Sequence, residues 1–167
     1  MLLPAVPGVE CSWRAGNLLI TDAGHEQIRV VAGSTGTFYG QPMTAGDIYT
    51  VAGDGQGGYT GDGGPATSAD LSANGMTLDA AGNLIIADDF DHRVRVVAHS
   101  SGTFYGKLMT AGDIYTVAGN GKDGFSGDGG PATKTAVGGP DGLAVNSAGN
   151  LLVTASYEHR VRMVEGG

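Results

Sequence analysis

Apolar and polar residues alternate in three short segments of this chain. The segments are Gln27–Val31, Arg93–Val97 and Arg160–Val164. A period of two predicts a strand, so in the second segment Val94 and Val96 would face one layer and Arg95 the other. The matching sets are Ile28 and Val30 against Arg29, and Val161 and Met163 against Arg162.

A turn and an apolar run precede each alternating segment. The three copies read AGNLLI (15–20), AGNLII (81–86) and AGNLLV (148–153). Gly-Asn suits a tight turn with positive φ, and a continuous apolar run suits a strand that is covered on both faces. A partner strand is expected before each turn, as Gly75–Asp79 and Gly142–Asn146. The first copy, Gly8–Trp13, departs from this pattern by one extra residue.

A fourth strand is predicted at Asp47–Ala52 and again at Asp113–Ala118, after the GTFYG loops. Both lie in a long duplication, because Met43–Thr67 returns as Met109–Thr133 with 20 of 25 positions identical. A repeat of this length indicates the architecture more strongly than any single predicted strand, so the repeat unit is identified first. We therefore predict one repeat array over residues 1–167, with units of about 5–67, 68–133 and 134–167. The last unit ends before its fourth strand.

Tandem units of four antiparallel strands predict an all-β fold. Each unit would be one blade of a β-propeller, and this chain would supply about three blades. Composition supports this prediction, since 31 glycines and 6 prolines in 167 residues separate short β-branched and aromatic runs. That distribution is typical of many strands joined by turns.

Charge and cysteine content narrow the classes of partner. A net charge of −8 disfavours nucleic acid or an anionic membrane surface, and it permits cations or basic proteins. The single cysteine, Cys11, excludes an internal disulfide and a cysteine cluster for zinc. Met1–Cys11 lacks a basic segment and is interrupted by prolines, so we expect neither a signal peptide nor a membrane span there. The compartment stays open.

The string Gly75–Val97, GMTLDAAGNLIIADDFDHRVRVV, resembles the NHL repeat. Gly142–Val164 matches nearly as well, although Thr154 and Ala155 replace the Ala-Asp pair of the second unit. The first unit keeps Asp22 but has Glu26 where the others have histidine. The resemblance implies a propeller of about six blades that serves most often as a binding platform.

One face of the predicted blades gathers acidic residues. Alternate connections of an antiparallel blade emerge on opposite faces, so the Gly-rich interblade loops share a face with the loops between second and third strands. The ligand-face candidates are Asp62, Asp88, Asp89, Asp91, His92, Asp128, Glu158 and His159. Asp22, Asp54 and Asp123 belong to the same face.

Asp62, Asp123 and Asp128 are the candidates for a metal site. Hard cations such as calcium bind several carboxylate and carbonyl oxygens, and glycine lets carbonyls approach. The favoured alternative is that Asp62 and Asp128 accept hydrogen bonds from N–H groups of their own turns. Apart from calcium at these residues, the sequence predicts no cofactor.

Three further sets of residues admit two interpretations each. Asp88 and His92 could be a catalytic pair, but the resemblance implies that this segment ties the second strand to the third. The arginines at the centre of the three alternating segments, Arg29, Arg95 and Arg162, could form an anion-binding row, or they could be solvated or paired with acids. The aromatic residues of the GTFYG loops could stack on sugars, although packing onto a blade edge is favoured. These are Phe38, Tyr39, Phe104 and Tyr105.

The sequence favours a non-enzymatic binding scaffold for a protein or small-molecule ligand, because its distinctive residues recur in every unit. The alternative is a lyase or hydrolase with a divalent cation held by histidines. Its candidate ligands, His25, His92, His99 and His159, are few and regularly placed. An arc of three blades leaves two apolar sheet faces open. We expect either a homodimer that closes one six-bladed ring or the remaining blades of a longer chain.

Overall fold

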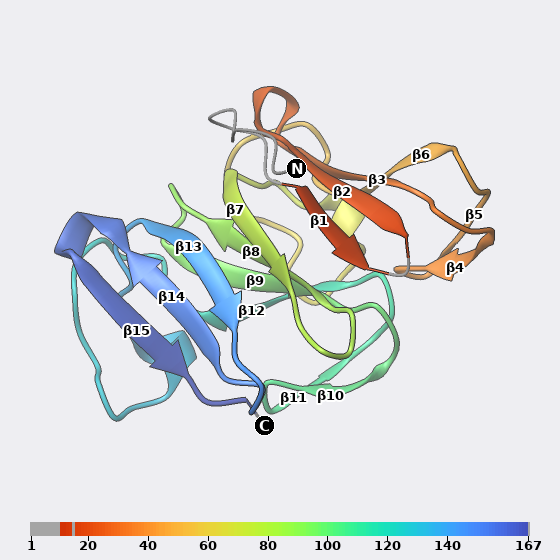
Figure 1. Ribbon diagram of the computed structural model, residues 1–167. Coiled ribbons are helices and arrows are strands. Elements are labelled where there is room, and N and C mark those ends of the chain that lie inside the picture. The colour runs from red at the N-terminus through yellow and green to blue at the C-terminus, as the bar shows by residue number, and fades with distance from the viewer. Residues whose placement is uncertain (1–10, 15, 167) are drawn as a thin grey trace, which may run out of the picture.

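The computed structural model describes residues 11–14 and 16–166, which form three blades arranged side by side as part of a propeller (Figure 1). The first blade has the strand order β1-β2-β3-β6. Its strands are β1 (Cys11–Arg14), β2 (Asn17–Asp22), β3 (Gln27–Val31) and β6 (Ile48–Ala52). The predicted all-β fold with antiparallel blades is confirmed.

The second blade repeats this order, and the third has three strands in the described part of the chain. The second comprises β7 (Ala73–Leu78), β8 (Leu84–Asp88), β9 (Arg93–Val97) and β12 (Ile114–Ala118). The third comprises β13 (Pro140–Val145), β14 (Leu151–Ala155) and β15 (Arg160–Val164). The three alternating segments of the sequence are strands with the predicted bounds. Within residues 11–14 and 16–166, helical structure is limited to short 3-10 turns at Ala23–His25, Ala66–Ser68, Ala132–Lys134 and Ser156–Glu158.

The GTFYG segments form small hairpins and not simple loops. The hairpins are β4 (Gly36–Phe38) with β5 (Gln41–Met43), and β10 (Gly102–Phe104) with β11 (Lys107–Met109). Tyr39 and Gly40, at the tip of the first, have φ of 49° and 74°. Two consecutive positive φ values are the requirement of a type I′ hairpin turn, whose twist matches that of the strands. These strands have only three residues each, which is too short for a clear alternation in the sequence.

The predicted Gly-Asn turns precede the second strand of every blade. Gly82, in the second blade, has the expected positive φ of 90°. The asparagine that follows has a further role, because Asn83 Oδ1 accepts a hydrogen bond of 2.9 Å from the N–H of His99, just beyond β9. Asn17 and Asn150 accept equivalent bonds from Gly33 and Gly166. The asparagine thus joins each turn to the end of the third strand.

The core lies between the blades, in two layers. The layer between the first and second blades contains Leu19, Ile28, Val30, Leu84, Ile86 and Val97. The layer between the second and third contains Ile85, Val94, Val96, Leu151, Val153 and Ala155. Both faces of the second blade are therefore covered, which explains why β8 is buried at every position. In the described part of the chain, no helix has the length and apolar character needed to cross a membrane.

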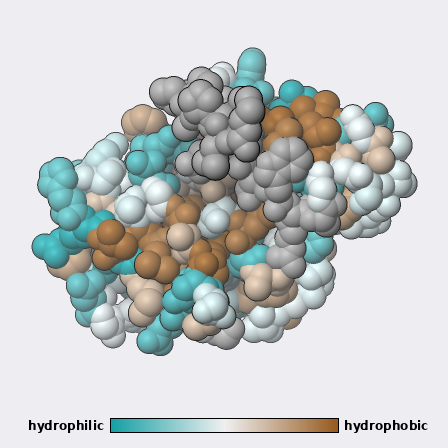
Figure 2. Space-filling view, in the orientation of Figure 1, coloured by the Kyte–Doolittle hydropathy of each residue, from teal (hydrophilic) through white to brown (hydrophobic). Residues whose placement is uncertain are grey.

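The far face of the third blade is open. Its third-strand residues Val161 and Met163 are 67% and 57% exposed, although they occupy the positions of the buried Val94 and Val96. Figure 2 shows apolar side chains gathered over β14 and β15. This exposed apolar surface corresponds to the surface that the second blade buries against the third.

Candidate functional site

The central arginine of the second blade is fully buried in a cluster of polar groups. Arg95 is 0% exposed, and its Nη1 donates to Asp88 Oδ2 at 3.3 Å and to the carbonyl oxygen of Asp70 at 2.9 Å. Its Nη2 donates to the carbonyl oxygen of Thr60 at 2.5 Å, and its Nε lies 3.8 Å from Asp62 Oδ1. The predicted pairing of the arginine with acids is confirmed for Arg95. The guanidinium joins β8, β9 and the Gly-rich loop.

Asp88 is the buried acid of this cluster, at the end of β8. Its Oδ1 accepts a hydrogen bond of 2.7 Å from the N–H of Ser72. Burial raises the pKa of Asp88 to about 7, although the Ser72 N–H and the Arg95 charge act in the opposite direction. The acid does tie the second strand to the third as expected, but its partner is Arg95 and not His92.

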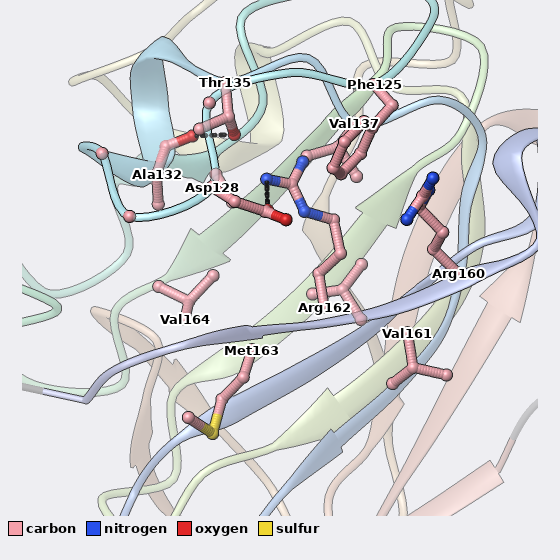
Figure 3. Close-up of a pocket in the computed structure, with 15 residues that line it drawn as sticks. Phe125, Asp128, Ala132, Thr135, Val137, Arg160, Val161, Arg162, Met163 and Val164 are labelled. Atoms are coloured by element: carbon pink, nitrogen blue, oxygen red, sulfur yellow. Dashed lines mark hydrogen bonds and ion pairs between the residues drawn. The ribbon is translucent and has the colours of Figure 1, made fainter.

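The third blade contains a more open version of the cluster. Arg162 Nη1 donates to the carbonyl oxygen of Ala136 at 2.7 Å, and Nη2 donates to that of Ser126 at 2.9 Å. Nη2 also lies 2.6 Å from Asp128 Oδ1, a carboxylate that is 69% exposed (Figure 3). The position of Asp88 is taken here by Ala155. The arginine-to-loop contact is thus a repeated feature of the blades, and the buried acid is specific to the second.

An aromatic ring from the Gly-rich loop lies beneath each arginine. The guanidinium carbon of Arg95 is 4.9 Å from the centre of the Tyr59 ring, and that of Arg162 is 5.0 Å from the centre of the Phe125 ring. Such cation–π contacts favour a fixed position of the charge. Their signal in the sequence is the aromatic residue three positions before each Gly-Asp-Gly-Gly aspartate.

The Gly-rich loops use their aspartates in two ways. Asp54 and Asp123 cap their own turns, by accepting from the N–H groups of Gln56 at 2.9 Å and Gly124 at 2.8 Å. The same prediction for Asp62 and Asp128 is wrong. Asp62 accepts from Thr116 Oγ1 of β12 at 3.0 Å, and Asp128 pairs with the arginine of β15. These two carboxylates therefore connect the loop to the blade that follows it.

The three calcium candidates do not converge. Among the described residues, no group of three His, Cys, Asp or Glu side chains is placed to hold a metal ion. Asp62 and Asp128 lie in the arginine clusters of different blades, and Asp123 faces its own turn. A guanidinium lies beside each of the first two carboxylates.

The loops between second and third strands hold the junction of the second and third blades. His92, His159 and Glu26 share a left-handed backbone with φ of 51° to 53°. His92 Nδ1 accepts from the N–H of Gly139 at 3.3 Å, and Glu158 Oε2 accepts from that of Gly138 at 3.1 Å. His92, in the second blade, thus contacts the chain that leads into the third blade, and Glu158 binds that same chain from within the third blade. His159 is exposed.

Asp89 and Asp91 lie near these junctions. Burial raises the pKa of Asp89, and the charge of Asp141 raises it further. Asp91 acts in the same direction on Glu26, whose pKa is raised first by burial. One oxygen of each aspartate, Asp89 Oδ1 and Asp91 Oδ2, is buried and has no hydrogen-bond partner among the described residues. The acidic residues of the predicted face therefore lie in separate places and do not form one site.

The aromatic residues of the hairpins pack against the blades. The Tyr39 hydroxyl donates to the carbonyl oxygen of Gly82 in the second blade at 3.2 Å, and its ring meets His99 edge-on at 5.3 Å. The Tyr105 hydroxyl donates to Asp79 Oδ2 at 3.4 Å, and burial raises its pKa. Phe38 and Phe104 pack against the two core layers. The favoured prediction, packing onto a blade, is confirmed.

A groove of about 370 Å³ lies along the open edge of β15. Its walls include Phe125, Asp128 and Gly130 from the loop and Arg162 and Val164 from the strand (Figure 3). This groove was not predicted from the sequence.

The sequence matches no protein-family model and no curated protein. Solved structures that are similar in fold include the following three. A structural genomics protein of unknown function from Bacteroides thetaiotaomicron VPI-5482 has a TM-score of 0.67 at 18% identity, over 90% of this chain and 32% of that one.

The other two are auxiliary nutrient binding proteins. The one from Bacteroides ovatus ATCC 8483 has a TM-score of 0.67 at 20% identity. The one from Bacteroides thetaiotaomicron VPI-5482 has a TM-score of 0.64 at 16% identity. Each similarity covers 95% of this chain and 37% of the other. This chain therefore spans about a third of the length of the structures it resembles.

Proposed function

We propose that this chain is part of an NHL-type β-propeller that acts as a non-enzymatic binding scaffold, and that two copies close one ring. Three features support a binding role. The residues that recur in the blades, such as Arg95 and Arg162, make contacts that hold strands and loops together. The blade sequences resemble the NHL repeat. Two of the structural neighbours are auxiliary nutrient binding proteins.

The observation that carries the ring is the match between the two open ends of the arc. The open face of the third blade presents Leu152, Thr154, Val161 and Met163. These are the counterparts of Ile85, Ala87, Val94 and Val96, with which the second blade covers the third. An identical type of surface is thus buried at the internal junction and exposed at the end.

The open face of the first blade is the complementary surface. It presents Leu18, Ile20, Arg29 and Val31, which are half-buried, and Ile48, which is 44% exposed. Their counterparts Leu84, Ile86, Arg95, Val97 and Ile114 face the first blade inside the molecule. The third blade of one copy can therefore dock on the first blade of another as the blades already dock inside the chain.

Two such junctions would generate a closed ring of about six blades. Full burial of a side chain such as Met163 is worth about 1.5–3 kcal/mol, so several together favour association. The same surfaces would also be covered by further blades of a longer chain. The ligand of the completed propeller would be a protein segment or a small molecule.

The mass of the protein in solution tests the ring. We expect light scattering at micromolar concentration to give twice the chain mass of 16.8 kDa. Met163→Asp places a charge on the open face and should give the single-chain mass. Leu108→Asp is the matched control, because Leu108 is 81% exposed on β11 and should leave the dimer intact. A stable monomeric parent would refute the ring, and a polydisperse parent would favour a longer chain.

A separate experiment tests the binding role. A set of sugars, amino acids and short peptides can be screened by thermal shift, where a bound ligand raises the Tm. We expect any ligand found in this way to be recovered chemically unchanged by NMR after incubation. Turnover of such a ligand would contradict the non-enzymatic role and favour the lyase or hydrolase alternative.

A further inference from the structure

Five aspartates of this chain are each followed by a glycine. In such a pair the backbone nitrogen of the glycine can attack Cγ of the aspartate, because glycine has no Cβ to obstruct the approach. The attack also requires the carboxyl group to lie against the next peptide bond. The pairs are Asp54–Gly55, Asp62–Gly63, Asp123–Gly124, Asp128–Gly129 and Asp141–Gly142.

The aspartates of the two Gly-Asp-Gly-Gly segments are held by strands that are distant in sequence. Asp62 Oδ1 accepts from Thr116 Oγ1 at 3.0 Å, and the N–H of Gly63 donates to a carbonyl oxygen of β12 at 2.7 Å. Asp128 Oδ1 accepts from Arg162 Nη2 at 2.6 Å. These bonds oppose the movement of either carboxyl group toward its own following nitrogen.

The first and last pairs are held in other ways. Asp54 Oδ1 accepts from the N–H of Gln56, two residues further on, at 2.9 Å. Asp141 Oδ1 accepts from a side chain of β7 at 3.1 Å, and the N–H of Gly142 donates to Thr154 Oγ1 at 2.7 Å. Both the carboxyl group and the nitrogen of the last pair are therefore engaged elsewhere.

Asp123 contacts the glycine that follows it. Among the five pairs, all of which lie in the described residues, only here does the aspartate Oδ1 accept from the N–H of the next residue, at 2.8 Å. Because Oδ1 is bonded to Cγ, this contact holds the Gly124 nitrogen beside the carbon that it would attack, and such positioning accelerates an intramolecular reaction. Asp123 is exposed, and a Cβ at Gly124 would meet no atom within 4 Å, so the peptide bond has room to turn.

Two Asn-Gly pairs could react in the same way, with ammonia as the leaving group. Asn120 Oδ1 accepts from the N–H of Lys122 at 3.0 Å, and its Nδ2 donates to the carbonyl oxygen of Lys134 at 3.0 Å. Asn74 lies within β7, where its Nδ2 donates to an aspartate of β13. Both asparagine side chains are therefore directed away from the glycine that follows them.

We propose that Asp123–Gly124 is a site of spontaneous isoaspartate formation in the folded protein. The Gly124 nitrogen forms a bond to Cγ of the protonated carboxyl group and loses its proton, while a C–O bond breaks, so that one water leaves and a succinimide forms. Solvent water then adds to the main-chain carbonyl carbon of Asp123, and the bond from this carbon to the Gly124 nitrogen breaks. The backbone now runs through Cβ and Cγ, with one extra carbon and no net change in mass.

The modified residue would lie in the loop that joins the second blade to the third. Phe125 follows two residues later, and its ring centre lies 4.0 Å from the guanidinium carbon of Arg160. An extra backbone carbon before Phe125 changes the segment that positions this ring. The equivalent residue of the other Gly-rich loop is Gly57, so the site is specific to one blade junction. It goes beyond the proposed function, since it needs neither a ligand nor a second copy.

Ageing of the whole chain at 37 °C, followed by digestion with endoproteinase Asp-N, tests the proposal. This enzyme cuts before aspartate and not before isoaspartate. The unmodified chain gives the fragments 113–122, 123–127 and 128–140. Isoaspartate at position 123 gives 113–127, and isoaspartate at position 128 gives 123–140. We expect fragment 113–127 to accumulate in mass spectra at least about tenfold faster than fragment 123–140.

Ageing in urea separates the effect of the fold from that of the Asp-Gly sequence. The contacts of both aspartates are lost in the unfolded chain, so the ratio of the two rates should fall to about one. Arg162→Leu is the matched variant in the folded state, because it releases the Asp128 carboxylate and leaves the Asp123 contact in place. It should raise the rate at position 128 and leave the rate at position 123 unchanged.

A second variant compares two asparagines with the same leaving group in the same loop. Asp123→Asn should form the succinimide at position 123 by loss of ammonia, with a mass gain of about 1 Da after hydrolysis. In the folded variant we expect this conversion to be about tenfold faster than that of Asn120, whose side chain is held by two hydrogen bonds. Fragmentation of the 113–127 peptide assigns the mass gain to one of the two positions.

Three results would overturn the proposal. One is a folded chain in which isoaspartate forms no faster at position 123 than at position 128. Another is a ratio of these two rates that stays the same in urea, which would assign the difference to the neighbouring sequence and not to the fold. The third is faster conversion of Asn120 than of the asparagine introduced by Asp123→Asn.

Discussion

The second and third blades place the same arginine in two different environments. Arg95 and Arg162 occupy the middle of equivalent strands and bind equivalent carbonyl groups of the preceding loop. The side chain of Arg95 is 0% exposed and faces the buried Asp88, whereas that of Arg162 is 12% exposed and faces the open Asp128. The alternating pattern of the strand therefore determines the face on which the arginine lies. The neighbours of the arginine determine how much its contact with the carboxylate contributes to stability.

The two arginines differ because their surroundings bury them to different extents. The guanidinium of Arg95 and the carboxylate of Asp88 are both 0% exposed, and Asp62 beside them is 28% exposed. The third blade has no described fourth strand, and its groove admits water to Asp128. A charge that is removed from a closed cluster leaves a buried opposite charge, and removal from an open cluster does not.

The sharpest test of this comparison removes each arginine in turn. Arg95→Leu should lower the free energy of unfolding by about 3–5 kcal/mol, because it leaves the buried Asp88 without its opposite charge and removes the donor to two carbonyl oxygens. Arg162→Leu should lower it by about 1 kcal/mol, since Asp128 is solvated. Urea unfolding at pH 8 measures both. Equal losses in the two variants would show that the closed and open clusters are energetically alike.

The raised pKa of Asp88, in the second blade, predicts that the free energy of unfolding depends on pH. Its pKa rises from an ordinary value near 3.8 to about 7 on folding, so the folded state binds the proton more tightly. This contribution is fully present below about pH 4 and is lost as the pH rises through 7. The free energy of unfolding should fall over that range by at most about 4 kcal/mol.

Asp88→Asn is the control for that dependence, because it fixes a neutral side chain at the site. Asp89 and Glu26, whose pKa values are also raised, stay in the variant, so the informative quantity is the difference between the two pH profiles. We expect the parent profile to fall more steeply between pH 4 and 7. Parallel profiles would show that Asp88 keeps its ordinary pKa in the folded protein.

Two equivalent glycines, Gly75 in β7 and Gly142 in β13, allow the covered second blade to be compared with the open third blade. A Cβ at Gly75 would collide with the carbonyl oxygen of Asp141 in β13, whereas a Cβ at Gly142 would meet Thr154 Oγ1 at 3.1 Å. Gly75→Ala should lower the free energy of unfolding by about 1–3 kcal/mol, and Gly142→Ala by less than about 1 kcal/mol. Thermal unfolding of both variants measures this.

The same pair also bears on the ring. If a second copy covers the third blade as the third covers the second, a Cβ at Gly142 should meet the inner strand of that copy. Gly142→Ala should then shift the solution mass toward the single chain while the fold persists. An intact dimer in this variant would mean that the two junctions differ in geometry.

The repeat and the alternation were enough to predict the blades. The strand Arg93–Val97 has the predicted bounds, because a period of two and its Gly-Asn turn are local signals. The hairpin turn at Tyr39 and Gly40 was missed because tyrosine with positive φ is rare and each strand has three residues. Its favourable twist becomes visible only in three dimensions.

The candidate site was less predictable, because its contacts join distant segments. Asp128 is bound by an arginine 34 residues away, so its sequence neighbours favoured a turn cap that does not form. Asp123, whose partner is the next residue, follows the local rule. The burial of Arg95 depends on the cover from another blade, which the strand's own pattern does not contain. Local reasoning thus placed side chains on faces but could not give their partners.

The smallest expected effect concerns the two hairpins. Tyr39 is 7% exposed, and its hydroxyl reaches from the first hairpin to the carbonyl oxygen of Gly82 in the next blade. Tyr39→Phe should therefore lower the free energy of unfolding by about 1 kcal/mol. Tyr105→Phe should cost about half as much, because Asp79 keeps its hydrogen bonds to the N–H and side-chain amide of Asn83. Urea unfolding of both variants measures the difference, and a larger loss in Tyr105→Phe would contradict the view that the first hairpin holds its blade junction more firmly.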